Sequence, residues 1–204
     1  MKKHLSYLSE ESVNRDPFIQ FADWFKEHSE NYSGEKDAVV LATAGAGGKV
    51  SARMVLLKEF DYEGFVFYSN YDSKKGKQLA ENNNAALLFY WPELHRQVRI
   101  EGTVEKVSPE TSDAYFYSRP AGSRASAVVS PQSSIIPDRQ FLRNRVDQVK
   151  MLNPEKEIKR PANWGGYRLR PEWFDFWLEG DYRLHDRIAY EPTDSGWKIF
   201  RLAP

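Results

Sequence analysis

The sequence predicts an α+β fold in which a mostly antiparallel sheet or barrel carries helices at its periphery. Two observations lead to this prediction. Apolar runs of strand length recur along the 204-residue chain, and most are joined by short turns rather than by helical crossovers. The chain also shows no internal repeat, flexible linker or low-complexity block. We therefore expect a single domain over residues 17–204, preceded by a polar N-terminal segment over residues 1–16.

The first half of the chain contains one long helix and a series of strands. Asp16-Pro17 provides an N-cap and a proline at the first helical position, and apolar residues then recur at helical spacing to about His28. A second, short helix is capped by Ser73 and runs to about residue 82. Gly102 lies inside the last strand of this half, where a bend or bulge is plausible. The strands are predicted over residues 38–42, 50–57, 65–68, 85–91 and 97–107, with a hairpin turn at 45–48.

The second half combines helices with the remaining strands. Ser108-Pro109 starts a helix that reaches about Ser118, and a polar helix is predicted over residues 138–152. The stretch 119–137 between them is rich in Ser, Ala and Pro and shows no convincing long period. A charged loop covers residues 153–163. Short alternating runs then predict strands over residues 164–169, 173–178, 183–190 and 197–202, some of them paired.

The composition excludes several classes of protein. An apolar fraction of 41% with 28% charged residues is typical of a folded soluble protein. The absence of cysteine excludes a disulfide scaffold, a thiolate zinc site, an iron–sulfur cluster and a cysteine nucleophile. Lys+Arg and Asp+Glu both number 29, which argues against binding nucleic acid through bulk charge. No signal peptide or membrane span is visible. We expect a cytoplasmic protein with no nucleic-acid or membrane partner.

Common nucleotide-binding, metal-binding and hydrolytic motifs do not occur. The glycine-rich run 45–48 lacks the earlier glycine and the following Ser or Thr of a P-loop, and its spacing does not fit a dinucleotide-binding fingerprint. A hairpin turn explains it better. The four histidines stand at positions 4, 28, 95 and 185, with none at helical ligand spacing, and no Gly-x-Ser-x-Gly elbow occurs. We therefore assign no metal site.

Cationic residues gather in several short stretches, which together suggest a phosphorylated ligand. Residues 73–77 place three lysines and an N-cap hydroxyl at a helix N-terminus, where free backbone N–H groups favour an anion. Tyr115 and Arg119 lie four residues apart, hence on one helix face, and Ser123 follows closely. In the predicted strand 183–190, residues 183, 185 and 187 share one face. Each stretch taken alone also fits an ordinary solvated surface.

Arg53 and Lys58 bracket an apolar run of four residues. Because they are five residues apart, they point to opposite faces of a regular strand. They serve one ligand only if it wraps the strand end or if the strand bends. Otherwise they are two side chains whose charged ends reach water at the ends of a strand.

Nine short motifs occur in order from about Asp16 to the C-terminus, and together they resemble the pyridoxamine 5′-phosphate oxidase family. They are RMVLLK at 53–58, FYSN at 67–70, SKKG at 73–76, RQV at 96–98, SRP at 118–120, SPQSS at 130–134, WGGY at 164–167, RLHDR at 183–187 and RLAP at 201–204. Each motif is weak alone, but nine in order over nearly the whole chain are highly specific. The resemblance implies an FMN-binding split β-barrel and a homodimer with FMN at its interface.

The resemblance also implies an activity, the last step in making the vitamin B6 cofactor. Pyridoxamine 5′-phosphate or pyridoxine 5′-phosphate is oxidised to pyridoxal 5′-phosphate, with O2 as electron acceptor and H2O2 released, plus ammonia from the amine. The redox chemistry belongs to the flavin. Two alternatives stay open: another split-barrel flavin oxidoreductase, such as a flavin reductase, and a non-catalytic protein that binds pyridoxal phosphate or FMN.

The site residues follow from the motifs position by position. Those that match FMN contacts, some of them from the other subunit, are Arg53, Met54, Val55, Leu56, Leu57, Lys58, Tyr68, Ser69, Lys74, Lys75, Gln97, Gln132, Ser133, Trp177 and Arg187. Those that match substrate contacts are Lys58, Tyr115, Arg119, Ser123, Arg183 and His185. Of these, Arg183 and His185 match the catalytic pair that sits against the substrate ring.

The sequence departs from the family in two places. The family's N-terminal segment carries an Arg and, three residues later, a Tyr that fold over the substrate, and residues 1–7 contain no such pair. We expect residues 1–16 to form a truncated substrate lid. In addition, Arg124-Ala125-Ser126 stands where the family usually has Gln-Ile-Gly. This change puts an extra cation near the expected phosphate site.

Overall fold

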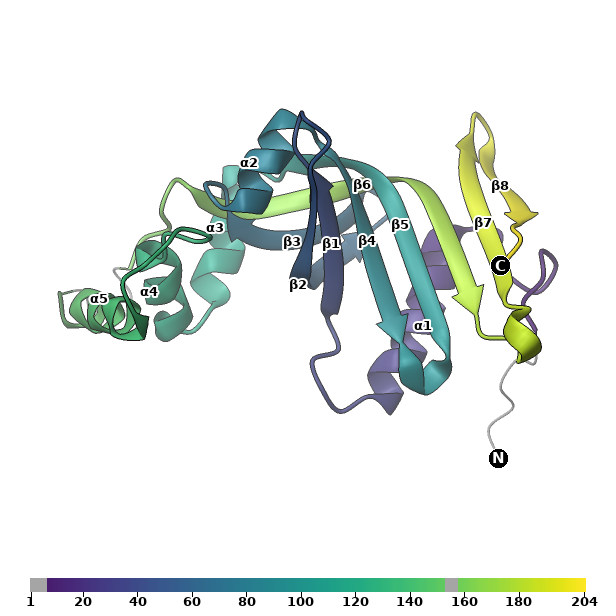
Figure 1. The fold of residues 1–204 in the computed structure, drawn as a ribbon, viewed down its shortest axis with the longest axis horizontal. Helices are drawn as coiled ribbons and strands as arrows, with labels where there is room; N and C mark the ends of the chain where they lie inside the picture. Colours follow the sequence, from purple (N-terminus) through teal and green to yellow (C-terminus); the bar gives the residue numbers. More distant parts are fainter. Residues whose placement is uncertain (1–6, 153–157) are drawn as a thin grey trace.

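The computed structural model describes residues 7–152 and 158–204 and contains a closed antiparallel barrel. The strands are β1 (Ala38–Ala44), β2 (Val50–Asp61), β3 (Gly64–Asn70), β4 (Asn84–Trp91), β5 (Arg96–Lys106), β6 (Trp164–Leu178), β7 (Asp186–Thr193) and β8 (Gly196–Arg201). Their order is β3-β2-β1-β4-β5-β6, and pairing of β3 with β6 closes the barrel. β7 and β8 extend the sheet beyond β6 (Figure 1). The predicted α+β fold with a mostly antiparallel barrel is confirmed.

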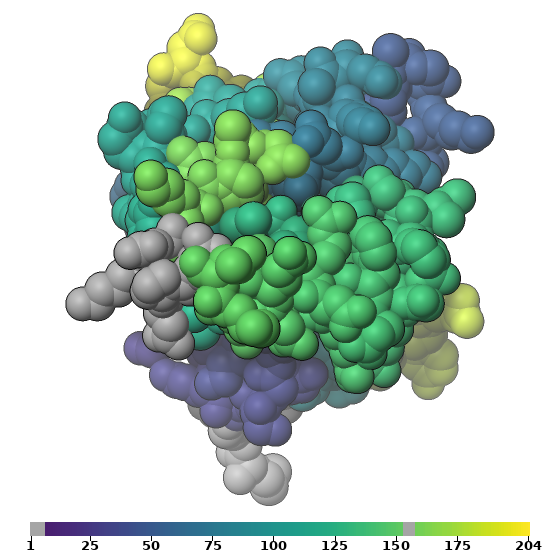
Figure 2. Space-filling view, turned by 90° about the vertical axis from the view of Figure 1, so that its left-hand side faces the viewer, coloured from purple at the N-terminus to yellow at the C-terminus, as the bar shows by residue number. Residues whose placement is uncertain are grey.

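The helices lie around this barrel. They are α1 (Pro17–Asn31), α2 (Lys74–Glu81), α3 (Pro109–Ser118), α4 (Ala121–Val129) and α5 (Arg139–Leu152), with 3-10 turns η1 (Pro92–Leu94) and η3 (Asp181–Arg183). α3, α4 and α5 gather at one end of the long axis, and the β7–β8 hairpin lies at the other (Figure 1). Seen from the helical end, α4 and α5 form a layer in front of the barrel (Figure 2).

Aromatic packing between α1 and the strands accounts for much of the aromatic content. As predicted, Asp16 caps α1. Its Oδ1 accepts a hydrogen bond from the Phe18 backbone N–H, with 2.8 Å between nitrogen and oxygen. Phe21 is fully buried, and its ring centroid lies 4.9 Å from that of Phe65 and 5.0 Å from that of Phe89, both edge-on. Burial of one such side chain contributes roughly 1.5–3 kcal/mol. This core makes the barrel a stable support for a site on its surface.

A bulge lets one long strand replace the two strands predicted at 164–169 and 173–178. β6 runs through Pro171 without a break, because the register with β5 shifts between Glu101 and Gly102. Gly102 pairs with Pro171 and Glu101 with Trp173, which leaves the proline at the bulge, where its missing N–H is tolerated. A Cβ at Gly102 would lie 1.9 Å from the Arg170 carbonyl oxygen, so only glycine fits. The irregularity expected at Gly102 is therefore confirmed.

Two further stretches differ from the sequence analysis. The stretch 119–137, which shows no long period, contains α4, whose only buried residues are Arg124, Ala125 and Val129. The strand predicted from residue 183 begins only at 186, because η3 precedes it and Tyr182 and Arg183 have left-handed φ angles of 56° and 65°. Residues 183, 185 and 187 therefore do not lie on one strand face.

The N-terminal segment contributes to the barrel core within the described residues. Leu8 and Val13 are buried there, while residues 1–6 of the proposed lid lie outside the described residues. The division into a segment 1–16 and a domain 17–204 stays a prediction, as does a cytoplasmic location. No helix in the described ranges is long and apolar enough to cross a membrane.

Candidate functional site

A cavity of about 280 Å³, beside β2, β3 and α3, collects half of the predicted site residues. It is lined by Met54, Val55, Leu56, Lys58, Tyr68, Ser69, Lys75, Tyr115, Arg119 and Gln132, together with Trp164, which the sequence analysis did not assign to the site. These residues come from six of the sequence motifs and, for Tyr115, from α3. The barrel closure and the packing of α3 on β6 bring them together.

Lys75, at this cavity, and the nearby Arg53 have no carboxylate partner among the described residues. Lys75 is 8% exposed, and its Nζ lies 3.0 Å from Ser69 Oγ and 2.8 Å from Gln132 Oε1. Arg53 donates to the Leu41 carbonyl at 3.0 Å and to Thr43 Oγ1 at 2.7 Å, and its other hydrogen-bond partners, Ser51 and Gln78, are also neutral. Burial, and then the charge of Arg53, lower the pKa of Lys75 to about 8. This region is electrostatically suited to an anion.

Aromatic rings and a further arginine form the other side of the cavity. Tyr68 stacks on Tyr115 with 3.9 Å between ring centroids, and Arg119 Cζ lies 4.7 Å from the Trp164 ring centroid. Tyr68 Oη and Arg119 Nη1 are buried without a hydrogen-bond partner among the described residues. Such orphaned polar atoms at a cavity indicate a site for a polar ligand. Burial raises the pKa of Tyr68 to about 12, so its phenol remains a donor at neutral pH.

Lys58 lines the cavity at an irregular point of β2. The pairing of β2 with β3 shifts register between Leu57 and Glu59, so the strand is irregular at Lys58, but Arg53 does not line this cavity. Lys58 Nζ lies 2.9 Å from Asp37 Oδ2. Lys58 therefore brings a charge that is already partly neutralised, and Asp37 is a partner that the sequence analysis did not anticipate.

Several predicted residues lie outside this cavity. Leu57 is buried in the barrel core, Lys74 is exposed on the first turn of α2, and Ser133 is exposed with a φ of 71°. Ser123 is half-buried on α4 without lining the cavity. Arg124, the cation at the departure from the family pattern, is buried rather than directed to solvent.

The remaining predicted residues form a second group. Gln97, Trp177 and Arg187 lie side by side across β5, β6 and β7, since Gln97 pairs with Trp177 and Trp177 with Arg187. The His185 ring centroid lies 4.7 Å from that of Trp177. Arg183 is exposed in η3, just before β7, and β7 lies at the end of the molecule opposite α3 (Figure 1). One chain alone therefore does not bring all the predicted residues into one site.

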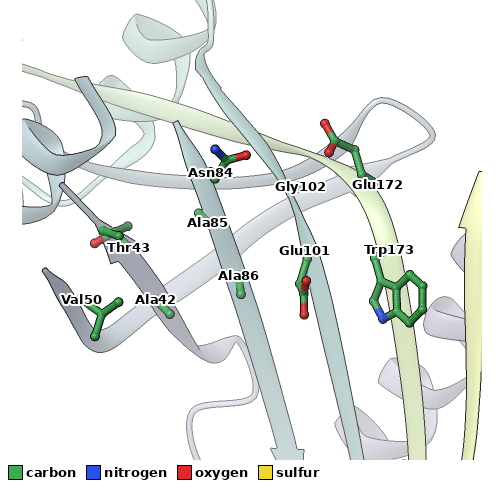
Figure 3. Close-up of a pocket in the computed structure, with 11 residues that line it drawn as sticks. Ala42, Thr43, Val50, Asn84, Ala85, Ala86, Glu101, Gly102, Glu172 and Trp173 are labelled. Carbon is green, nitrogen blue, oxygen red and sulfur yellow. The ribbon is translucent and has the colours of Figure 1, made fainter. Parts of the chain in front are cut away.

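A larger hollow of about 450 Å³ on the outer barrel face is a poorer candidate for an anion (Figure 3). Small side chains such as Ala42 and Ala86 line it, and its charged residues are Glu101 on β5 and Glu172 on β6. Carboxylates repel phosphate. The smaller cationic cavity, with its stacked rings, better suits a flat ligand that carries a phosphate. Within the described ranges, no group of three or more His, Asp or Glu could hold a metal ion.

Comparison with known families covers most of the chain. The family described as "Pyridoxamine 5′-phosphate oxidase" matches residues 25–153, and the "Pyridoxine 5′-phosphate oxidase C-terminal dimerisation region" matches residues 164–204. A relative from Nostoc sp., "Pyridoxine/pyridoxamine 5′-phosphate oxidase", is 51% identical over 98% of this chain and 94% of its own. A relative of the same name from Burkholderia mallei is 50% identical over 97% of this chain and 93% of its own.

Solved structures show the same architecture. One is PhzG from Burkholderia lata in complex with tetrahydrophenazine-1-carboxylic acid. It is 29% identical in sequence and has a TM-score of 0.89, and the match covers 98% of this chain and all of PhzG. An FMN-binding protein related to pyridoxamine 5′-phosphate oxidase, from Nostoc punctiforme, is 16% identical with a TM-score of 0.73 over 92% of this chain and 98% of that one, a likeness of fold alone.

Proposed function

The chain belongs to the pyridoxamine 5′-phosphate oxidase family, and on this basis we propose that it makes pyridoxal 5′-phosphate with FMN as cofactor. Pyridoxine 5′-phosphate and O2 give pyridoxal 5′-phosphate and H2O2. Pyridoxamine 5′-phosphate, O2 and water give the same products and ammonia. The observation that carries this proposal is the cavity in which Lys75 and Arg119, with Arg53 nearby, have no carboxylate partner within residues 7–152 and 158–204.

The residues present fit an FMN phosphate on one side of the cavity. Arg53 and Lys75 supply the charge, and Ser69 and Gln132, which already contact Lys75 Nζ, supply neutral hydrogen-bonding groups. Charge-assisted contacts of this kind give both affinity and a fixed position. The bound flavin supplies the redox chemistry by accepting a hydride equivalent from the substrate carbon that becomes the aldehyde.

The other side of the cavity fits the substrate phosphate. Arg119 packs on Trp164, with Cζ 4.7 Å from the ring centroid, and its buried Nη1 has no partner among the described residues, so this N–H donor is available to a ligand. Lys58 and Tyr115 line the same cavity. We assign Arg183 and His185 to the substrate ring, which they orient against the flavin. Such positioning lowers the activation free energy, because the substrate and the flavin no longer lose translational and rotational entropy in the reaction step.

We infer that a second copy of the chain completes the site. Gln97, Trp177 and Arg187 lie apart from the cavity within one chain, so they reach a flavin there only from a partner. The outer barrel face also leaves Val50 77% and Met54 57% exposed, which is typical of a surface covered by a partner. The match of residues 164–204 to a dimerisation region supports this homodimer, with FMN at its interface.

The activity is tested by spectroscopy and turnover. We expect purified protein to bind FMN, to show a visible flavin spectrum, and to form pyridoxal phosphate and H2O2 in equal amounts from pyridoxamine 5′-phosphate under air. A protein that takes up no FMN would contradict the flavoenzyme assignment. A yellow protein that forms no product would favour a carrier or another split-barrel flavin oxidoreductase.

FMN affinity is expected to fall as the pH rises above about 8. A phosphate dianion favours charged Lys75, whose pKa in the free protein is lowered to about 8, so binding above that pH takes up a proton. The apparent Kd then rises by up to about tenfold per pH unit until the pKa of the bound state is reached. Fluorescence titration of FMN between pH 6.5 and 9.5 measures this effect. Lys75→Arg keeps its charge throughout and should flatten the profile, and an unchanged slope in that variant would contradict the role of Lys75.

A further inference from the structure

Asp175 is a buried carboxylate to which the proposed function gives no role. It lies in β6 with 1% of its surface exposed. Arg187 donates to it twice, from Nη2 to Oδ2 at 2.5 Å and from Nε to Oδ1 at 3.4 Å, and Arg99 Nη2 lies 3.3 Å from Oδ2. Burying a carboxylate costs free energy unless it is paired and hydrogen-bonded. Its presence at this position therefore needs an explanation.

The strand register explains how these charged groups meet. Arg99 of β5 is directly opposite Asp175, whereas the residue opposite Asp175 on β7 is Ala189. Arg187 is opposite Trp177, two residues further along β6, so Asp175 and Arg187 are diagonal neighbours within reach of a long side chain. The small Ala189 side chain leaves room for this diagonal contact.

The two arginines depend on Asp175 to different degrees. Arg99 has a second carboxylate, since its Nε lies 3.0 Å from Glu101 Oε1. Arg187 otherwise donates to the Ala203 carbonyl at 3.1 Å, and over the described residues Asp175 is the one carboxylate within ion-pair distance of it. Without Asp175, the guanidinium groups of Arg99 and Arg187 would repel each other, and Arg187 would lose its orientation.

We propose that Asp175 is a positioning residue of the flavin site, which acts by holding the guanidinium of Arg187. The inference rests on the proposed function, in which Arg187 contacts FMN held by a second copy of the chain. A guanidinium has five N–H donors in a rigid fork, and the contacts to Asp175 and Ala203 leave some of them for a ligand. Fixing the fork before FMN arrives reduces the entropy lost on binding.

The test compares FMN binding by the wild type, Asp175→Asn, Arg187→Met and the double variant. We expect Asp175→Asn to raise the Kd for FMN about tenfold, as for loss of one charge-assisted hydrogen bond. At saturating FMN, its visible circular dichroism should change in the same direction as that of Arg187→Met. The double variant should bind FMN as weakly as Arg187→Met alone. Asp175 is proposed to act only by holding Arg187, so removing Asp175 has no further effect once Arg187 is gone.

Glu105→Gln is the matched control. It removes a carboxylate from the exposed Arg170–Glu105 pair on the same two strands, and it should leave both the Kd and the flavin spectrum unchanged. If Asp175→Asn does not fold, the double variant, which removes both charges, is compared with Arg187→Met alone. Equal FMN affinities support the inference, and weaker binding by the double variant overturns it.

The two proposals fail in different ways. If the wild type binds FMN and turns over while Asp175→Asn binds FMN as tightly and with the same flavin spectrum, the role of Asp175 is wrong and the proposed function stands. An additive effect of the two substitutions likewise overturns the positioning role. If the wild type takes up no FMN, the proposed function and this inference fail together.

Discussion

Replacing Arg53 with alanine is expected to weaken FMN binding by about 100-fold. Over the part of the chain that the structure describes, its guanidinium is held by neutral groups, the Leu41 carbonyl, Thr43, Ser51 and Gln78, so its charge can act on a phosphate. Two charge-assisted hydrogen bonds at about 1.5 kcal/mol each give this factor, since ~1.4 kcal/mol is tenfold. Quenching of FMN fluorescence on titration with the apoprotein measures the Kd.

Arg170→Ala is the matched control for this substitution. Arg170 is also a β-strand arginine, but it pairs with Glu105 at the exposed surface. Its loss should leave the FMN Kd within about twofold, because exposed pairs contribute little. The melting temperature of each apoprotein separates loss of the site from loss of the fold. An Arg53→Ala protein that retains FMN like the wild type would show that the flavin phosphate is bound elsewhere.

Replacing Arg183 with alanine is expected to lower kcat/KM for pyridoxamine 5′-phosphate by about 100-fold, with FMN retained. Arg183 is exposed in η3 with a left-handed φ of 65°, next to Tyr182 with a φ of 56°. Such backbone costs about 1–3 kcal/mol for a non-glycine residue and is typical of functional sites. Loss of a guanidinium that orients the substrate removes about 2–3 kcal/mol from the transition state.

Lys198→Ala provides the comparison for Arg183. Lys198 is an exposed cation on β8, the strand that pairs with β7. Its Nζ lies 5.3 Å from the Phe200 ring centroid. Steady-state kinetics with each variant, together with the FMN content of the purified protein, distinguish the two roles. If Arg183→Ala loses FMN as readily as Arg53→Ala, the division of the site between cofactor and substrate residues is wrong.

Local sequence patterns predicted most of the elements, and the failures have identifiable causes. Asp16-Pro17 and Ser73 start helices where expected, because a cap is made by neighbouring residues. The break expected in residues 164–178 does not occur, since Pro171 meets the bulge at Gly102 on another strand. α4 was not predicted because Pro120 stands at its N-cap and makes no side-chain cap, so the sequence carries no start signal of the kind that marks α1 and α2.

The residues of the candidate site could be predicted from the sequence, but the contacts between them could not. The motifs identified Lys75, Tyr115 and Arg119, which the structure brings to one cavity. They did not identify Trp164 as the ring beneath Arg119. They also missed Asp175, which holds Arg187, because that contact joins diagonal positions on neighbouring strands.

The sequence by itself determined the family and most of the strand and helix order, and it predicted the residue types that we propose to contact two phosphate-bearing ligands. These are properties of local spacing and of motif order along the chain. Only the tertiary structure decided which cations are neutralised, as Lys58 is by Asp37, and which are left for a ligand, as Lys75 is. It also separated the predicted site into two groups within one chain. Charge pairing and separation depend on strand register and barrel closure, which join residues far apart in sequence.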